Sequence, residues 1–210
     1  SRAGEPVVRL ALRQGMKIMA EQFVMGRDIG EAIARAREGG KGVRHSFDML
    51  GESAFTQADA DRYLVDYRKA IDALADDAGP MASGTVFERP GVSIKLSALH
   101  PRLEVGQRER VMAELVPRVL GLAERARRGG IGLTLDSEEA DRLDLLLDVV
   151  ERVFCSPALA GWEGFGLAVQ TYQKRALAEL EWLAALARSQ GRRLTVRLVK
   201  GAYWDAEVKR

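Results

Sequence analysis

The sequence has little of what disulfide-bonded, zinc-binding and membrane-spanning proteins require. Only one of its 210 residues is cysteine, Cys155, and two are histidine, which excludes an internal disulfide and a cysteine-based zinc site. No apolar run approaches the roughly 20 residues that span a bilayer, and the first residues show no signal-peptide core. We therefore expect a cytoplasmic protein without a metal centre, in which Cys155 is an inert, partly buried thiol.

Nucleotide-binding and nucleic-acid-binding signatures are also missing. The chain has no GxGxxG, GxxxxGK[ST] or HExxH pattern, so the usual arguments for a nucleotide-binding loop or a zinc protease do not apply. Its net charge is only +2, from 32 basic and 30 acidic residues, and no basic cluster alternates with aromatic residues. This balance argues against nucleic acid as a partner.

What the sequence does have is a repeated alternation of apolar and other residues. It occurs in VSIKLS at 92–97, IGLTLD at 131–136, GLAVQT at 166–171 and LTVRLV at 194–199. A period of two residues is typical of β-strands. If the apolar positions face a layer of helices, the opposite faces present Lys95, Asp136, Gln170 and Arg197. All four lie near the carboxyl ends of their strands, where parallel β/α enzymes place their active sites.

Helical patterns separate these strands. Residues 1–40 read as an N-terminal helical arm, with Val8, Leu12, Met16 and Met19 on one stripe and a second helix near 29–37. Residues 41–210 begin with a weaker strand at 43–50, and helices are expected near 57–76, 107–127, 140–154 and 174–190. Strands that alternate with helices of this length predict an α/β fold with a parallel sheet.

Two parallel architectures fit this order, and the strand composition separates them. A doubly wound sheet favours strands that are apolar on both faces. Here one face carries polar residues, namely Ser93, Lys95, Thr134, Asp136, Thr195 and Arg197. We therefore predict a (β/α)8 barrel of the TIM type, of which about five of eight β/α units fit before residue 210.

Each candidate site residue also has a structural interpretation. Lys95 fits a Schiff-base nucleophile or a cation for a substrate carboxylate, but also a lysine that extends from a strand end to water. Arg197 lies between Val196 and Leu198 and needs a charged partner, either Asp136 or a ligand. Asp136 itself has a glutamate three residues on, Glu139, which is the spacing of a helix cap.

The remaining candidates are similarly open. The side-chain amide of Gln170 could bind the edge of a heterocycle, or it could be a core amide whose hydrogen bonds are all made within the protein. In the segment RLVKGAYWDAEVKR at 197–210, Gly201 and Ala202 allow close approach of a planar ligand, and Tyr203 and Trp204 add aromatic surface. The same segment also fits a tight βα loop. His100 is interpreted as a structural residue in a turn.

Five ordered motifs together resemble the proline dehydrogenase domain of bacterial proline utilisation A, a bifunctional proline and pyrroline-carboxylate dehydrogenase. They are SFDMLGE (46–52), SIKLSALHP (93–101), LDSEEADR (135–142), VQTYQKR (169–175) and RLVKGAYWDAEVKR (197–210). The resemblance implies a flavoprotein of proline catabolism, built on a distorted (β/α)8 barrel with FAD at the strands' carboxyl ends. The implied reaction is hydride transfer from L-proline to FAD N5, which gives Δ1-pyrroline-5-carboxylate.

The resemblance also implies roles for individual residues. Lys95, Asp136 and Arg197 match catalytic positions, and Lys95, Asp136 and Tyr203 match substrate-binding positions. Asp48 and Glu52 match an acidic pair after the first strand. The positions implied to line FAD are Gln170, Arg197, Val199, Lys200, Gly201, Ala202 and Trp204.

The implied partners are L-proline, a quinone acceptor at the membrane surface with peripheral membrane association, the rest of the barrel, and an aldehyde dehydrogenase module. The family's last three β/α units, with adenosine-binding loops and a helix bearing paired arginines, have no counterpart in the 210 residues. We therefore expect a chain of this length alone to bind FAD poorly and to be nearly inactive. A Schiff-base aldolase or decarboxylase that uses Lys95, and a non-catalytic fragment, remain as alternatives.

Overall fold

The structure is a computed structural model that describes residues 5–40, 42–49, 51 and 53–208. The chain divides into two compact units, Ser1–Val43 and Arg44–Arg210. Each is described by itself.

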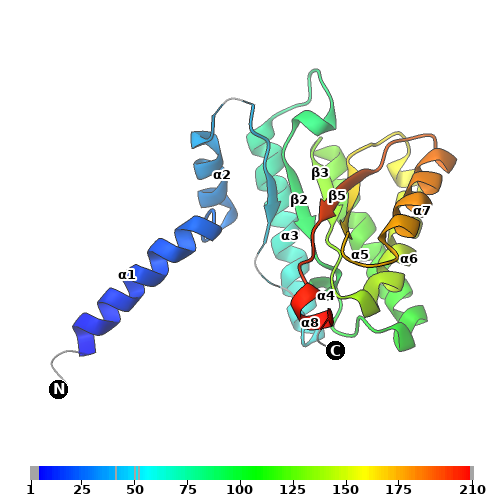
Figure 1. Cartoon of the computed structure of the whole chain (residues 1–210). Helices are drawn as coiled ribbons and strands as arrows, with labels where there is room; N and C mark the ends of the chain where they lie inside the picture. Colours follow the sequence, from blue (N-terminus) through cyan, green and yellow to red (C-terminus); the bar gives the residue numbers. More distant parts are fainter. Residues whose placement is uncertain (1–4, 41, 50, 52, 209–210) are drawn as a thin grey trace. The chain divides into compact units, whose positions relative to one another are not determined.

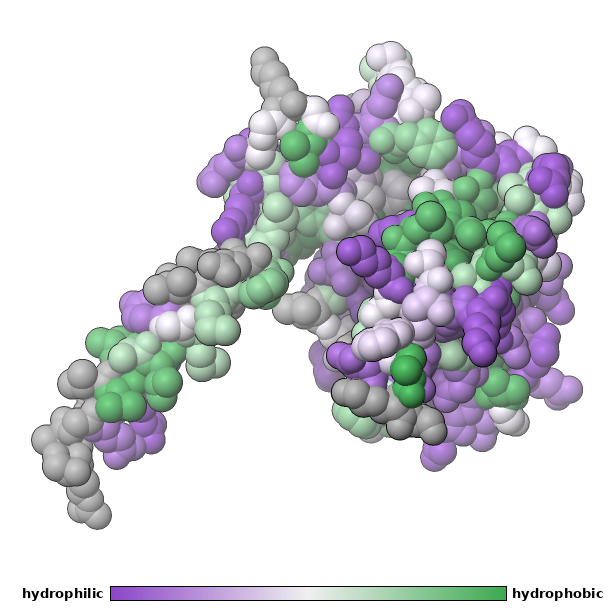
Figure 2. All heavy atoms as spheres, viewed as in Figure 1, coloured by the Kyte–Doolittle hydropathy of each residue, from purple (hydrophilic) through white to green (hydrophobic). Residues whose placement is uncertain are grey.

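The first unit contains two helices, α1 (Glu5–Phe23) and α2 (Ile29–Glu38). The carboxylate of Asp28 caps α2 by accepting a hydrogen bond from the Glu31 amide, as side chains at helix N-caps commonly do. Figure 2 shows apolar surface along α1, and its four predicted stripe residues are all more than half exposed.

The second unit is built on five parallel strands that pair in chain order. They are β1 (Ser46–Asp48), β2 (Gly91–Ile94), β3 (Gly132–Leu135), β4 (Phe165–Gln170) and β5 (Thr195–Val199). The helices are α3 (Gln57–Ala78), α4 (Leu96–Leu99), α5 (Arg108–Arg128), α6 (Leu143–Phe154), α7 (Ala176–Ser189) and α8 (Trp204–Val208). Short 3-10 turns lie at Val86–Glu88, Val105–Gln107, Ala140–Arg142 and Pro157–Leu159. Figure 1 shows the sheet curling, with the long helices on its outer side, so the predicted parallel α/β fold is confirmed.

The two faces of the sheet differ as the alternation predicts. In β2, β3 and β4 the apolar positions point to the helical layer and are completely buried, as at Val92, Ile94, Leu133, Leu135, Leu167 and Val169. The edge strand β5 differs, because Leu198 is exposed there. The register places Ser93 beside Thr134 and Ala168 beside Arg197. Polar and small residues therefore share the concave face, because successive side chains of a strand alternate in direction.

Two strands are shorter than their sequence patterns suggest. β1 has three residues rather than the eight of 43–50. β2 ends at Ile94, and Lys95 becomes the residue before α4. The chain turns there because the Lys95 amide donates to the Tyr67 hydroxyl (3.1 Å) and the Ser97 amide to the Glu138 carboxylate (3.0 Å). The alternation of 92–97 thus continues past the end of the strand.

Candidate active site

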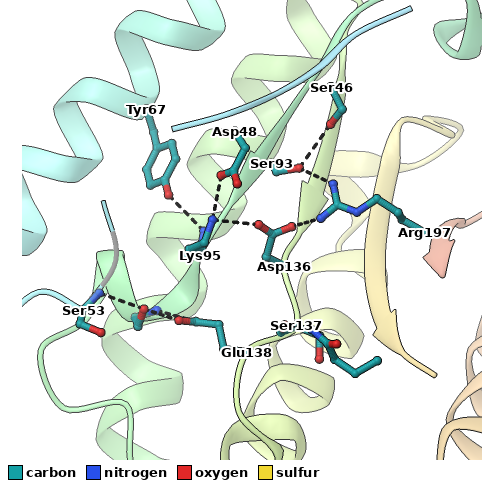
Figure 3. A network of polar contacts seen from close by, with 12 residues as sticks. Ser46, Asp48, Ser53, Tyr67, Ser93, Lys95, Asp136, Ser137, Glu138 and Arg197 are labelled. Carbon is teal, nitrogen blue, oxygen red and sulfur yellow. Dashed lines mark hydrogen bonds and ion pairs between the residues drawn. The ribbon is translucent and has the colours of Figure 1, made fainter. Parts of the chain in front are cut away.

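A row of alternating charges crosses the carboxyl ends of the strands (Figure 3). Lys95 Nζ lies 2.8 Å from Asp48 Oδ1 and 3.1 Å from Asp136 Oδ2. The Lys95 and Asp136 side chains are largely buried, with 14% and 11% of their surface exposed, whereas Asp48 is half exposed. Because the lysine lies between two carboxylates, its charge is compensated within the protein.

Arg197 extends the row from the edge strand β5. Its Nη2 donates to Asp136 Oδ1, and its Nη1 donates to Ser93 Oγ at 2.9 Å. Ser93 Oγ in turn lies 3.3 Å from Ser46 Oγ. Of the two partners predicted for Arg197, Asp136 or a ligand, the structure shows Asp136. This one carboxylate therefore joins two cations from different parts of the sheet.

These contacts favour a permanently charged Lys95. Burial alone would lower its pKa, but the hydrogen bonds and charges of Asp48 and Asp136 outweigh burial and raise the pKa above its ordinary value. A Schiff-base lysine needs the opposite shift, since only the neutral amine is a nucleophile. A charged Lys95 therefore argues against the aldolase-type chemistry kept as an alternative.

The helix-cap interpretation of Asp136 is wrong. The cap position of the following 3-10 turn is Glu139, which makes no side-chain cap hydrogen bond, and α6 begins after Arg142. Asp136 instead uses both carboxylate oxygens on Lys95 and Arg197.

Gln170 is an internal amide with partners at both ends. It is 3% exposed, its Nε2 donates to the Ser137 carbonyl at 2.9 Å, and its Oε1 accepts from the Ala202 amide at 3.0 Å. These bonds match the satisfied-amide interpretation. They also tie the loop after β3 to the turn after β5.

The other residues expected around a cofactor follow β5 in sequence. Val199 lies beside Gln170 in the sheet register. Gly201 and Tyr203 are partly exposed, while Lys200, Ala202 and Trp204 are exposed. Tyr203 precedes α8, and its carbonyl accepts the amides of Ala206 and Glu207. The turn is joined to the end of β4 by the hydrogen bond from the Ala202 amide to Gln170.

Three further expectations concern residues outside the row. His100 is buried, its Nδ1 accepts from the Arg102 amide, and its Nε2 lies 3.2 Å from Glu114, which fits a structural histidine. Burial raises the pKa of the partly buried Cys155 thiol, which agrees with an inert residue. Glu52, the expected partner of Asp48, lies outside the described residues.

A second group of polar residues, which was not predicted from the sequence, adjoins Lys95. Ser97 and Glu138 are buried and hydrogen-bonded to each other, and Tyr67 supports the Lys95 backbone from α3. Tyr67 lies on the apolar stripe of its helix, where a buried hydroxyl gives no distinct signal. Ser97 and Glu138 lie two residues after Lys95 and Asp136, and this equal offset was the available clue.

Two features are absent from the described part of the chain, a metal-binding group of side chains and a membrane-spanning helix. Within that part, no three histidine, cysteine or acidic residues form a group that could hold a metal ion. None of the described helices is long and apolar enough to cross a membrane.

Comparison with known proteins gives consistent matches. The family model for proline dehydrogenase matches residues 31–210. The bifunctional protein PutA of Salmonella typhimurium is 50% identical over 211 residues, which cover all of this chain and 16% of that protein. The proline dehydrogenase of Deinococcus radiodurans is 31% identical, over 97% of this chain and 59% of that protein.

Solved structures agree with the sequence matches. A Bradyrhizobium japonicum proline utilisation A mutant superposes with a TM-score of 0.83 and 52% identity, over 99% of this chain and 21% of that one. The enzyme of Bdellovibrio bacteriovorus inactivated by N-propargylglycine gives 0.85 at 25% identity, over 95% and 22%. The chain thus spans about a fifth or less of the proline utilisation A proteins and 59% of the Deinococcus proline dehydrogenase. Because the family match covers most of its length, the chain belongs to the proline dehydrogenase family.

Proposed function

We propose that these residues form the first part of a proline dehydrogenase barrel that oxidises L-proline to Δ1-pyrroline-5-carboxylate. The observation that carries the proposal is the row Asp48, Lys95, Asp136 and Arg197 at the carboxyl ends of the strands, in a chain of this family. In a (β/α)8 barrel this is the end that holds the active site. Three further β/α units would continue the sheet from β5, and residues 1–40 would form a separate helical arm.

The residues at this end fit a flavin. The Arg197 guanidinium has five N–H donors. One N–H of Nη1 bonds to Ser93 and one of Nη2 bonds to Asp136, so three donors remain for the acceptor atoms of an isoalloxazine ring. Gln170 keeps a second N–H beside the one that it gives to Ser137. Val199, Lys200, Gly201, Ala202 and Trp204 follow on the same side and would hold the ring and the ribityl chain of FAD.

Lys95 and Asp136 would bind the substrate. An ammonium group has three donors, and among the described residues Lys95 gives two of them to Asp48 and Asp136. The third suits the carboxylate of proline. Asp136 would then face the amine end of the substrate pocket, with Tyr203 as a wall.

The reaction removes a hydride from the carbon next to proline's nitrogen and a proton from the nitrogen itself, which leaves the C=N bond of the product. FAD, when bound, supplies the hydride acceptor. Arg197 would provide a positive charge at the place where the acceptor gains electrons, and such preorganised charge lowers the barrier. In the whole protein, electrons would pass to a quinone at the membrane surface, and an aldehyde dehydrogenase module would use the product.

Replacement of Arg197 tests this assignment. In the full-length protein, Arg197→Met should slow flavin reduction by proline by about 10- to 100-fold, because one preorganised charge is lost. Arg193→Met is the matched control, since Arg193 is exposed and pairs with Glu163 outside the row. Equal reduction rates in the two variants would contradict the role of Arg197.

A further inference from the structure

Glu138 binds Ser97 through both oxygens of its carboxylate. The Ser97 amide donates to Oε2 at 3.0 Å, and the Ser97 hydroxyl donates to Oε1. Glu138 is 5% exposed and Ser97 3%, and Arg142 Nη1 lies 3.6 Å from Glu138 Oε1. Burying a carboxylate costs free energy unless hydrogen bonds and charges compensate for the loss of water. The two Ser97 donors and Arg142 provide that compensation for Glu138.

This pair repeats the geometry of the charged row one step further along the chain. Lys95 pairs with Asp136, and Ser97 pairs with Glu138, so each pair joins residues 41 positions apart. Paired residues of β2 and β3 are also 41 positions apart, so both side-chain pairs join the chain segments that directly follow these two strands.

Ser97 passes this restraint to a third loop. Its hydroxyl accepts the Ser53 amide at 3.1 Å, and its carbonyl accepts the Ala54 amide at 2.8 Å. Ser53 has a φ of +59°, a left-handed conformation that non-glycine residues adopt at a cost. Because both amides of this corner bond to Ser97, we attribute its conformation to the contact with Ser97.

We propose that Glu138 is a positioning residue for the substrate site, which acts through Ser97 to hold the loops after β1, β2 and β3 together. Those three loops carry or follow Asp48, Lys95 and Asp136 (Figure 3). Burial raises the pKa of Glu138, although the Ser97 donors and Arg142 oppose the rise. The link between Glu138 and the three loops does not depend on the proposed function, whereas its expected effect on proline binding does.

Hydrogen exchange tests the structural step without any turnover. In the full-length holoprotein, Glu138→Ala should speed exchange of the Ser53 and Ala54 amides by about tenfold. Both amides donate to Ser97, and Ser97 would no longer be held in place by Glu138. Glu139→Ala is the control, because Glu139 shares Arg142 but has no contact with Ser97 among the described residues. Unchanged exchange in a folded Glu138→Ala protein would overturn the proposal.

Kinetics test the consequence for the site. Glu138→Ala and Ser97→Ala should each raise the KM for proline by about tenfold with a smaller change in kcat, and the double variant should be no worse than either single one. Glu138→Gln, which keeps an oxygen for the Ser97 amide, should restore part of the loss. It also replaces Glu138→Ala if that variant fails to fold.

The outcomes separate the two claims. Faster exchange with an unchanged KM would show that Glu138 ties the loops without positioning the substrate, and it would overturn the proposal. Additive effects of the two substitutions would overturn the route through Ser97. Absence of proline oxidation in the parent protein would instead contradict the proposed function. The hydrogen-exchange result would then still test whether Glu138 holds the loops through Ser97.

Discussion

Asp136 is the residue on which the charged row depends. It is the anion shared by Lys95 and Arg197, and only 11% of its side chain is exposed. Asp48 also pairs with Lys95, but half of its side chain contacts solvent. Removing a carboxylate from a buried pair leaves an uncompensated charge, whereas water replaces an exposed carboxylate.

We therefore expect Asp136→Asn to lower the Tm of the full-length protein by about 5–10 °C, because the largely buried Lys95 loses its buried anion and Arg197 loses the same partner. Asp48→Asn serves as the matched control, with an expected decrease below about 3 °C. Thermal unfolding at neutral pH measures both. Similar losses in the two variants would contradict the central place of Asp136.

The sequence predicts which residues meet here, but not all their bonds. Period-two alternation fixes the face on which Lys95, Asp136 and Arg197 lie, and parallel pairing then brings them together. It does not reveal that Gln170 bonds to Ser137 and Ala202, or that Glu138 bonds to Ser97. Those contacts depend on backbone turns after the strands, where side-chain alternation carries no information about distance.

At the level of elements, the sheet and its long helices follow from the sequence. Apolar alternation and apolar stripes locate the strands and the helices that cover them, because both patterns reflect burial of one face. The short helix α4 was not predicted. LSAL at 96–99 continues the strand's alternation, and only the bonds to Tyr67 and Glu138 show that the chain has turned.

Helix α7 carries a buried acid outside the proposed site. Glu179 is 5% exposed, and its Oε1 has no hydrogen-bond partner in the described part of the chain. Burial raises the pKa of Glu179 to about 7, against a weaker opposing effect of Arg175. The folded state therefore prefers the protonated acid, so stability should fall as pH rises from about 4.5, its unfolded pKa, through 7.

Replacement by glutamine should remove this dependence. At pH 5, Glu179→Gln and the parent should unfold at nearly the same temperature, and at pH 8 the variant should unfold about 3–6 °C higher, because it has no charge to bury. Glu181→Gln, on the exposed face of the same helix, provides the control. A constant difference between Glu179→Gln and the parent at all pH values would contradict the explanation.

At the scale of the whole molecule, the second unit is an open sheet with β5 at one edge. Leu198 on β5 is 63% exposed. A groove of about 760 Å³ runs between the start of β5 and α7, lined by residues that include Ala184, Ala187, Leu194 and Thr195. An uncovered strand edge next to apolar side chains invites pairing, as the proposed continuation of the barrel would require.

That continuation makes Leu198 a test position. In the full-length protein, Leu198→Asp should lower the Tm by about 5 °C or more, because a charge would be buried under the next β/α unit. Val105→Asp is the control, since Val105 is similarly exposed in the turn before α5. If the two substitutions cost the same, β5 is not covered.

In the proposed enzyme, the row of charges at the strands' carboxyl ends belongs to a flavin site that oxidises proline. The most direct measurement is the visible absorption spectrum of the full-length protein, recorded without oxygen before and after L-proline is added. We predict a yellow protein whose flavin bands bleach with proline. A colourless protein, or a yellow one that dithionite bleaches and proline does not, would contradict the claim.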